Sequence, residues 1–260
     1  MSFRFSVITS VERIERKFSV ISKIRDFTNY NVSTGELTPV ITSNQPKSLQ
    51  YFEFGWNANN ALEQFRNPYV CAEGNLNPDN DQLYAGSMGI ITHPEFKEAI
   101  KSRRCIVIAD ALLVWNKVNA FLVYPKNKKR PFVMAGIWNE FLDPLTGELR
   151  KSFAIITTVT NELFQDLEQN RAPLILNDFK LRVWMNGRHL TDVVHTMKPF
   201  DASLFNAYPI DKSIANPENK SITLLQPVGP RLYDEKSYVS PRLRSRASDR
   251  RSSKGLKPNA

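Results

Sequence analysis

The chain has 260 residues, of which 42% are hydrophobic, and a formal net charge of +9. This length and hydrophobic content allow one large domain or two small ones with a real core. The apolar runs are too short for a transmembrane helix, and two cysteines exclude a disulfide framework or a zinc cluster.

The positive charge is concentrated at the C-terminus. Residues 236–260 contain eight Lys or Arg and one Asp, a net charge of +7, which leaves +2 for residues 1–235. We therefore expect one domain over residues 1–235, followed by a basic and disordered tail at 236–260. The N-terminus lacks the apolar core of a signal peptide, which predicts a cytoplasmic protein.

The chain begins with a strand pattern. Residues 3–7 read Phe, Arg, Phe, Ser, Val, and this alternation predicts a strand with one buried face. Thr9 and Glu12 then have the spacing of a capping box, in which the first residue caps a helix and the fourth reaches back to it. A short helix should therefore follow, to about Phe18.

The next segment is predicted to contain strands and a long loop. Residues 30–42 have turn and strand character, with Gly35 at the turn, and residues 49–55 alternate like another short strand. Residues 57–82 are rich in Asn and read as a surface loop. Loops of this length are often functional.

The most informative stretch is residues 101–115. It begins basic at Arg103 and Arg104 and then becomes apolar, with Asp110 as the one acid inside the apolar run. A continuous apolar run with several β-branched residues predicts a strand buried on both faces. Pro94 reads as a residue of the first turn of a preceding helix, so we expect that helix to deliver both arginines to the start of a core strand.

The second half alternates strands and helices. The pattern predicts strands at 120–124, 131–138, 152–158 and 173–176, a basic turn at 125–130, and helices at 161–169 and 178–185. Residues 197–227 contain four prolines and should be irregular. Many short strands with few helices indicate an α+β fold, a mainly antiparallel sheet or open barrel.

Several short motifs follow one another in a characteristic order. They are Met1-Ser-Phe-Arg-Phe5, Tyr30-Asn31, Phe54-Gly55, Tyr84 to Gly89, His93 to Lys97, Arg103 to Trp115, Ala135 to Trp138, Thr157-Thr158, Arg171-Ala-Pro173 and Ala207 to Ile210. This order resembles the SRAP family, the SOS-response-associated peptidases that process abasic sites. The resemblance covers roughly residues 1–227 and implies the α+β fold of that family.

The resemblance also implies where catalytic groups should lie. In the family, an N-terminal Cys captures the abasic sugar aldehyde as a thiazolidine, while an Asn, a Glu and a His position the sugar and move protons. The matching positions here are Ser2, Tyr84, Val114 and Gln169, with Glu168 as an alternative to Gln169. None keeps the family residue, and a valine cannot transfer a proton. We therefore expect an intact scaffold with its reactive groups replaced.

Other motif residues that could bind DNA are kept. The resemblance implies a polar, mainly basic groove formed by Arg4, Asn31, Lys97, Arg103, Arg104 and Arg171. We expect no cofactor and no metal site, because the three histidines lack partners at ligand spacing. Single-stranded or abasic DNA is the expected partner, with a protein partner possible, no membrane contact, and a monomeric state.

Three functions remain open at this point. The chain could bind single-stranded or gapped DNA without chemistry, which is the preferred hypothesis. It could retain abasic-site crosslinking through the Ser2 amine, whose ordinary pKa of about 8 permits a Schiff base with an aldehyde. It could instead hold a protein partner, since Met88, Leu113 and Val114 would make the cleft apolar.

Overall fold

The computed structural model describes residues 3–57, 66–126, 129–143 and 145–235. Ser2, residues 58–65 of the Asn-rich loop, two residues of the basic turn and the predicted tail 236–260 lie outside the described residues. The first sheet contains β1 (Phe3–Val7), β3 (Asn29–Val32), β8 (Ala111–Trp115), β9 (Ala120–Pro125) and β14 (Phe205–Ile210). Its order is β14-β9-β8-β1-β3, and all its pairs are antiparallel.

The second sheet is larger. It contains β2 (Ile21–Ser22), β4 (Leu37–Thr42), β5 (Gln45–Phe54), β6 (Tyr69–Cys71), β7 (Arg104–Ala109), β10 (Phe132–Leu142), β11 (Leu149–Val159), β12 (Arg171–Pro173) and β13 (Ile175–Leu176). The main path runs β12-β11-β10-β7-β4-β5-β2, and β6 pairs in parallel with β11. The predicted α+β class with a mainly antiparallel sheet is confirmed.

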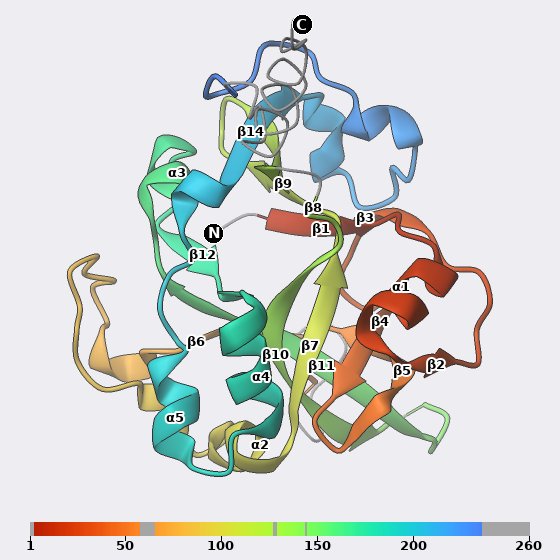
Figure 1. Cartoon of the computed structure of the whole chain (residues 1–260), viewed down its shortest axis with the longest axis vertical. Helices are drawn as coiled ribbons and strands as arrows, with labels where there is room; N and C mark the ends of the chain where they lie inside the picture. Colours follow the sequence, from red (N-terminus) through yellow and green to blue (C-terminus); the bar gives the residue numbers. More distant parts are fainter. Residues whose placement is uncertain (1–2, 58–65, 127–128, 144, 236–260) are drawn as a thin grey trace, which may run out of the picture.

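Short helices lie outside the sheets (Figure 1). They are α1 (Val11–Phe18), α2 (Lys97–Ser102), α3 (Glu162–Asp166), α4 (Asp178–Asn186) and α5 (Leu190–His195), with single 3-10 turns η5 (Ala202–Leu204), η6 (Lys212–Ala215) and η7 (Ile222–Leu225). The helix predicted at 178–185 is confirmed, and Asn177 caps it by accepting from the Lys180 N–H. Pro94 precedes α2 in a turn rather than lying in its first turn.

The sequence predicts one strand in the stretch 101–115, and this prediction is wrong. The stretch contains two strands that belong to different sheets. The chain turns at Asp110, between β7 and β8. The buried Asp110 carboxylate accepts from the backbone N–H groups of Ile8 and Thr9, both at 2.7 Å, and from the Thr9 hydroxyl at 2.6 Å. A buried carboxylate requires such donors, so the acid joins this corner to the end of β1.

The same contact overturns the predicted capping box. The hydroxyl of Thr9 bonds Asp110, and the N-cap of α1 is Ser10, whose side chain makes no cap hydrogen bond. The predicted irregular stretch at 197–227 is also corrected, because it contains β14. That strand lies at the edge of its sheet, where Pro209 is tolerated since an edge strand needs fewer ladder N–H groups.

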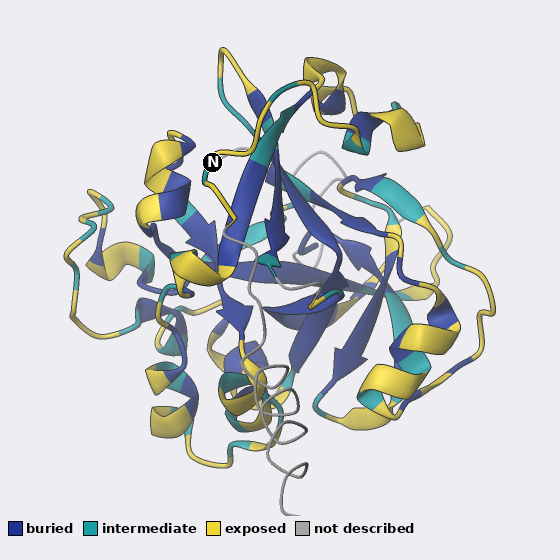
Figure 2. Ribbon diagram, turned by 45° about the horizontal axis from the view of Figure 1, so that its top comes forward, coloured by how far each residue is buried: buried dark blue, intermediate teal, exposed yellow. Residues whose placement is uncertain are grey.

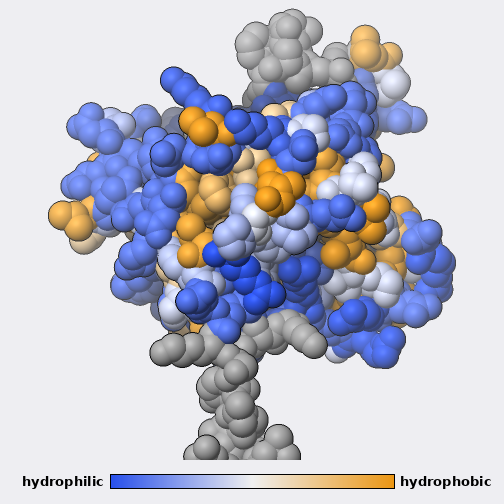
Figure 3. Space-filling model, turned by 90° about the horizontal axis from the view of Figure 1, so that it is seen from above, coloured by the Kyte–Doolittle hydropathy of each residue, from blue (hydrophilic) through white to orange (hydrophobic). Residues whose placement is uncertain are grey.

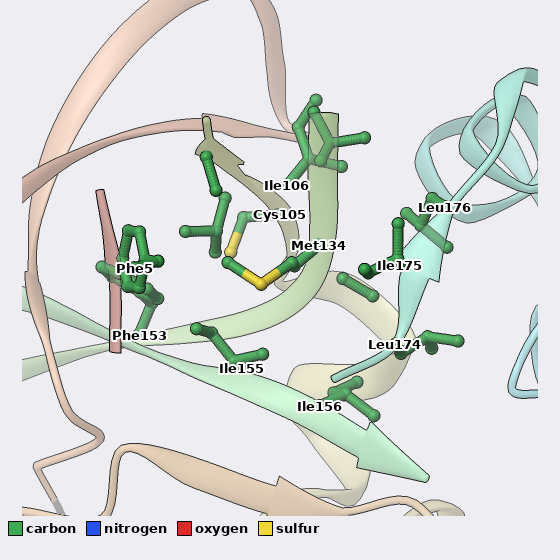
Figure 4. Packing of buried hydrophobic residues seen from close by; sticks show 14 of the residues in the cluster. Phe5, Cys105, Ile106, Met134, Phe153, Ile155, Ile156, Leu174, Ile175 and Leu176 are labelled. Carbon is green, nitrogen blue, oxygen red and sulfur yellow. The ribbon is translucent and has the colours of Figure 1, made fainter. Parts of the chain in front are cut away.

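The hydrophobic core is formed mainly by the strands of the two sheets and by the inner faces of the helices. Figure 2 shows buried strands beneath helices whose outer faces are exposed. Rings of Phe5, Phe54 and Phe153 pack together, with centroid distances of 5.3 and 5.4 Å from Phe54, and Figure 4 shows the neighbouring aliphatic side chains and Cys105. A Cβ on Gly136 would come within 2.9 Å of the Cys105 sulfur, so this position requires glycine.

On the face shown in Figure 3, hydrophilic residues surround apolar side chains that are gathered near its middle. Among the described residues, no helix is both long and apolar enough to cross a membrane.

Candidate functional site

The start of the chain is held against the end of β8. β1 and β8 pair antiparallel, with Phe3 opposite Val114 and Arg4 opposite Leu113. Phe3 and Val114 are both fully buried. The reactive position predicted at Ser2 lies outside the described residues, but the residue that follows it directly faces Val114. The structure therefore brings the first described residue of β1 and the predicted position 114 together.

Two further groups surround this pairing. The Tyr69 hydroxyl, on β6, donates to the carbonyl of Phe3, and the two rings lie 4.5 Å apart. Burial raises the pKa of Tyr69, so its hydroxyl stays protonated and acts as a donor. The side-chain amide of Gln169 donates to the Trp115 carbonyl at 3.1 Å. We call Phe3, Arg4, Tyr69, Val114, Trp115 and Gln169 the N-terminal site.

Arg4 provides the positive charge of this site. Its guanidinium carbon lies 5.0 Å from the centroid of the Trp115 ring, a cation–π distance. The same guanidinium donates to the carbonyls of Ile214 and Ala215 at 2.9 and 3.1 Å. The Arg4 side chain therefore connects β1 to the end of β8 and to η6. It also places a positive charge beside an aromatic ring.

Asn31 bonds residues 214–219, the segment that begins at the end of η6 and that we call the covering segment. Its buried amide lies 3.1 Å from the carbonyl oxygens of Ile214, Asn216 and Asn219. Burial and these three contacts give Asn31 a structural role, fixing residues 214–219 over β3.

A polar network adjoins the N-terminal site on the larger sheet. Arg171 forms an ion pair with the buried Glu73 and donates to Asn80 at 2.6 Å. The Cys71 thiol donates to the Glu73 carboxylate at 3.2 Å. Burial, with the Glu73 charge, outweighs the Arg171 charge and raises the pKa of Cys71. Cys71 therefore remains a thiol at neutral pH, a weak nucleophile.

Tyr84 lies in a loop beside this network. Asn80 and Gln82, from the same loop, both donate to the carbonyl of Asn170, next to Gln169. The Tyr84 hydroxyl, however, donates to the carbonyl of Ser87 at 2.7 Å, within its own loop. The backbone of this loop thus reaches the region of Gln169, while the Tyr84 side chain closes the loop on itself.

The other predicted DNA-binding residues lie elsewhere. Lys97 is exposed on α2, and Arg103 is half-buried directly after that helix. Arg104 is buried, and its guanidinium donates to the carbonyls of Ile100, Lys101, Trp184 and Gly187 at 2.7 to 2.9 Å. Its donors are therefore used to join α2 to α4, and Figure 1 places α2 far below the chain start. The predicted residues do not form one groove.

Two of the predicted catalytic positions carry side chains that cannot transfer protons. Val114 is apolar and the Gln169 amide does not titrate near neutral pH. Glu168 is an exposed carboxylate at the edge of the site, where Asn116 donates to it at 2.8 Å. Among the described residues, no three His, Cys, Asp or Glu are grouped to hold a metal ion.

Sequence reasoning missed Tyr69 and Cys71. Both were placed in a loop because Asn and Pro surround them, yet they lie on β6 and on the same face of that strand. The short apolar run Tyr-Val-Cys within a polar region was the available signal. It was too short to be separated from loop sequence without knowledge of β11, to which it pairs.

Comparisons with known proteins agree with this geometry. The sequence matches the family profile described as SOS response associated peptidase (SRAP) over residues 1–217. It is 30% identical over 140 residues to "Abasic site processing protein YoqW" of Bacillus subtilis (strain 168), a match that covers 51% of this chain and 61% of that protein. It is 26% identical over 141 residues to "Abasic site processing protein YedK" of Escherichia coli (strain K12), with coverage of 51% and 61%.

Solved structures share the fold. A crystal structure of a protein from Bacteroides thetaiotaomicron has a TM-score of 0.71 and 25% sequence identity, covering 87% of this chain and 99% of that chain. A second, from Bordetella bronchiseptica, has a TM-score of 0.63 and 18% identity, covering 81% and 100%. The second likeness concerns the fold alone.

Proposed function

This chain belongs to the SRAP family, and from that premise we propose that it binds single-stranded or abasic DNA at the N-terminal site without forming a covalent bond to it. The proposed setting is the DNA-damage response, because the curated relatives are named as abasic site processing proteins. The sequence match spans only 61% of the length of those relatives.

The observation that carries DNA binding is the contact between Arg4 and Trp115. A guanidinium 5.0 Å from a half-buried indole combines a cation for phosphate with an aromatic surface for an unstacked base. Proteins that bind single strands without sequence preference use these two elements together.

The absence of covalent chemistry is supported by the side chains that surround the chain start. The resemblance to the family matches Val114, and Gln169 or Glu168, to its proton-transferring groups. Val114 and Gln169 do not transfer protons at neutral pH, and the Glu168 carboxylate already accepts a hydrogen bond from Asn116. The nearby thiol of Cys71 has a raised pKa and donates to Glu73. These groups hold the fold or bind, so we propose a non-catalytic role.

Binding is tested with a fluorescent single-stranded oligonucleotide, with and without one abasic site, over a series of salt concentrations. We expect binding that weakens steadily as salt increases, because phosphate contacts release counterions. Trp115→Ala should weaken binding by about tenfold, the loss of one stacked base. Phe179→Ala, which removes an exposed ring on α4, is the matched control. Binding that ignores salt, or equal effects of the two variants, would refute the proposal.

The covalent alternative is tested on the same complexes. Borohydride reduces a Schiff base to a stable amine, so a crosslink to abasic DNA would report a reactive Ser2 amine. We expect no trapped product for the wild type or for an N-terminally blocked form. A product seen only with the free N-terminus would overturn the non-covalent part while leaving DNA binding intact.

A further inference from the structure

A cavity with a volume of about 520 Å³ lies away from the N-terminal site. It is bounded by the end of α1, the connection between β9 and β10, β13, the start of α4, and η5. Its floor is apolar, and the rings of Phe132, Phe200 and Phe205 form a packed cluster within it, with centroid distances of 4.8 and 5.5 Å. Leu204, at 50% exposed, reaches solvent from this lining. The volume falls in the range of ligand-binding cavities.

The lining also carries an excess of positive charge. Its cationic side chains are Lys17, Lys126, Lys129, Arg130 and Lys180, and its anionic ones are Asp178 and Asp201. Asp201 is already occupied in capping η5, where it accepts from the Ser203 N–H. Cations therefore dominate the charge around an apolar floor.

Two of these lysines are held in place by neutral partners. Lys17 donates to the carbonyl of Pro131, and Lys180 donates to the carbonyl of Lys198 at 2.9 Å. A carbonyl orients an ammonium group without cancelling its charge. Burial lowers the pKa of both lysines, although Asp178 partly opposes this at Lys17. Lys17 is exposed and Lys180 is half-buried, so the carboxylates of a ligand can reach both ammonium groups from solvent.

The floor discriminates between ligand classes. Among the described lining residues, Asn177 is the one uncharged polar side chain, and its oxygen accepts from the Lys180 N–H at the start of α4. A nucleobase in this floor would leave several donors and acceptors poorly paired. An aliphatic or phenyl side chain has no such groups and gains from burial.

The C-terminal segment of this chain does not suit the cavity as an occupant. Residues 236–260 carry a net +7 and have the wrong charge for a basic rim. We propose that this cavity binds a linear acidic peptide of a partner protein, with one aromatic or aliphatic side chain in the apolar floor and flanking carboxylates on the lysines and Arg130. This inference does not depend on DNA binding at the N-terminal site.

The test measures binding of a labelled hexapeptide made of four aspartates followed by leucine and phenylalanine. We expect saturable binding that weakens as salt rises, because rim contacts are electrostatic. Replacing leucine and phenylalanine in the peptide by serine should abolish it. In the protein, Lys180→Glu and Leu204→Glu should each weaken binding by about tenfold. Lys101→Glu, an equal charge change on α2, is the control and should leave affinity unchanged.

Other outcomes would overturn the proposal. Failure of the wild type to bind the hexapeptide, or equal losses in Lys180→Glu and Lys101→Glu, would exclude a docking site at this cavity. If a single-stranded oligonucleotide displaces the peptide and its own binding depends on Lys180, the cavity belongs to a nucleic-acid site. Circular dichroism and thermal unfolding of each variant separate lost binding from lost folding.

Discussion

The N-terminal site and the cavity beside α4 both contain cations, but the surroundings of these cations differ. At the N-terminal site and its neighbouring network, Arg4 and Arg171 bond carbonyls and the carboxylate of Glu73. At the cavity, Lys17 and Lys180 bond carbonyls beside an apolar floor. The first set matches family motifs and the second does not. Cations of both regions thus bond carbonyls, and what differs is what lies beside them: an indole and the Glu73 carboxylate in the first region, and an apolar floor in the second.

The largest expected effect comes from replacing Arg104, a motif arginine whose guanidinium donates to four backbone carbonyls. Arg104→Met should lower the free energy of unfolding by about 4 kcal/mol, because it leaves four carbonyls of α2 and α4 without their donor. Urea unfolding followed by circular dichroism measures this loss. Arg103→Met is the neighbouring control and should cost far less, since Arg103 is half-buried. Similar losses for the two would indicate that Arg104 is not structural.

A second, smaller effect concerns the ion pair of Arg171. Arg171→Ala leaves the buried carboxylate of Glu73 without its cation and should cost about 3 kcal/mol. The double variant with Glu73→Ala removes the unpaired charge and should recover part of that loss. A double-mutant cycle from urea unfolding gives the coupling between them. Additive losses, without coupling, would contradict the structural role assigned to this pair.

The smallest predicted effect lies at Glu235. The Tyr124 hydroxyl donates to this carboxylate at 2.6 Å and is the main reason that the pKa of Glu235 is lowered. Because the pKa of Glu235 is lower in the folded than in the unfolded state, its ionised carboxylate stabilises the fold at pH values above the unfolded pKa of about 4.3. This stabilisation is lost as the pH falls through the pKa of the folded state. Because Glu235 is largely exposed, Glu235→Gln should cost roughly 0.5 kcal/mol at neutral pH.

The measurement is thermal unfolding of the wild type and Glu235→Gln between neutral pH and about pH 3. The difference between the two should be greatest at neutral pH and vanish in acid. A difference that grows in acid would give the wrong sign and refute the assignment.

The sequence was sufficient to predict the fold class and most strands, because alternation and β-branched runs are local properties. It failed at Asp110, where one apolar run is divided between two sheets. A single acid in such a run cannot reveal that its partners are the N–H groups of Ile8 and Thr9, about a hundred residues earlier. β14 was missed for a related reason, since only its edge position makes Pro209 acceptable.

The candidate site was partly predictable. Motif order placed the chain start beside Val114 and Gln169, and β1 and β8 pair as this requires. The role of each arginine was not predictable, since the same residue type bonds carbonyls at Arg104 and lies over an indole at Arg4. The role of each arginine depends on the residues that surround it in the folded protein, and a short motif does not specify those residues.

The covering segment at 214–219 has a consequence for synthesis of this chain on the ribosome. Arg4 and Asn31 are made early, but the carbonyls that bind them belong to residues translated about two hundred positions later. Contacts so distant in sequence close slowly and late. β1 and β3 therefore lack these hydrogen bonds until residue 214 has been translated, and a premature stop before Ile214 would leave Arg4 and Asn31 without these acceptors.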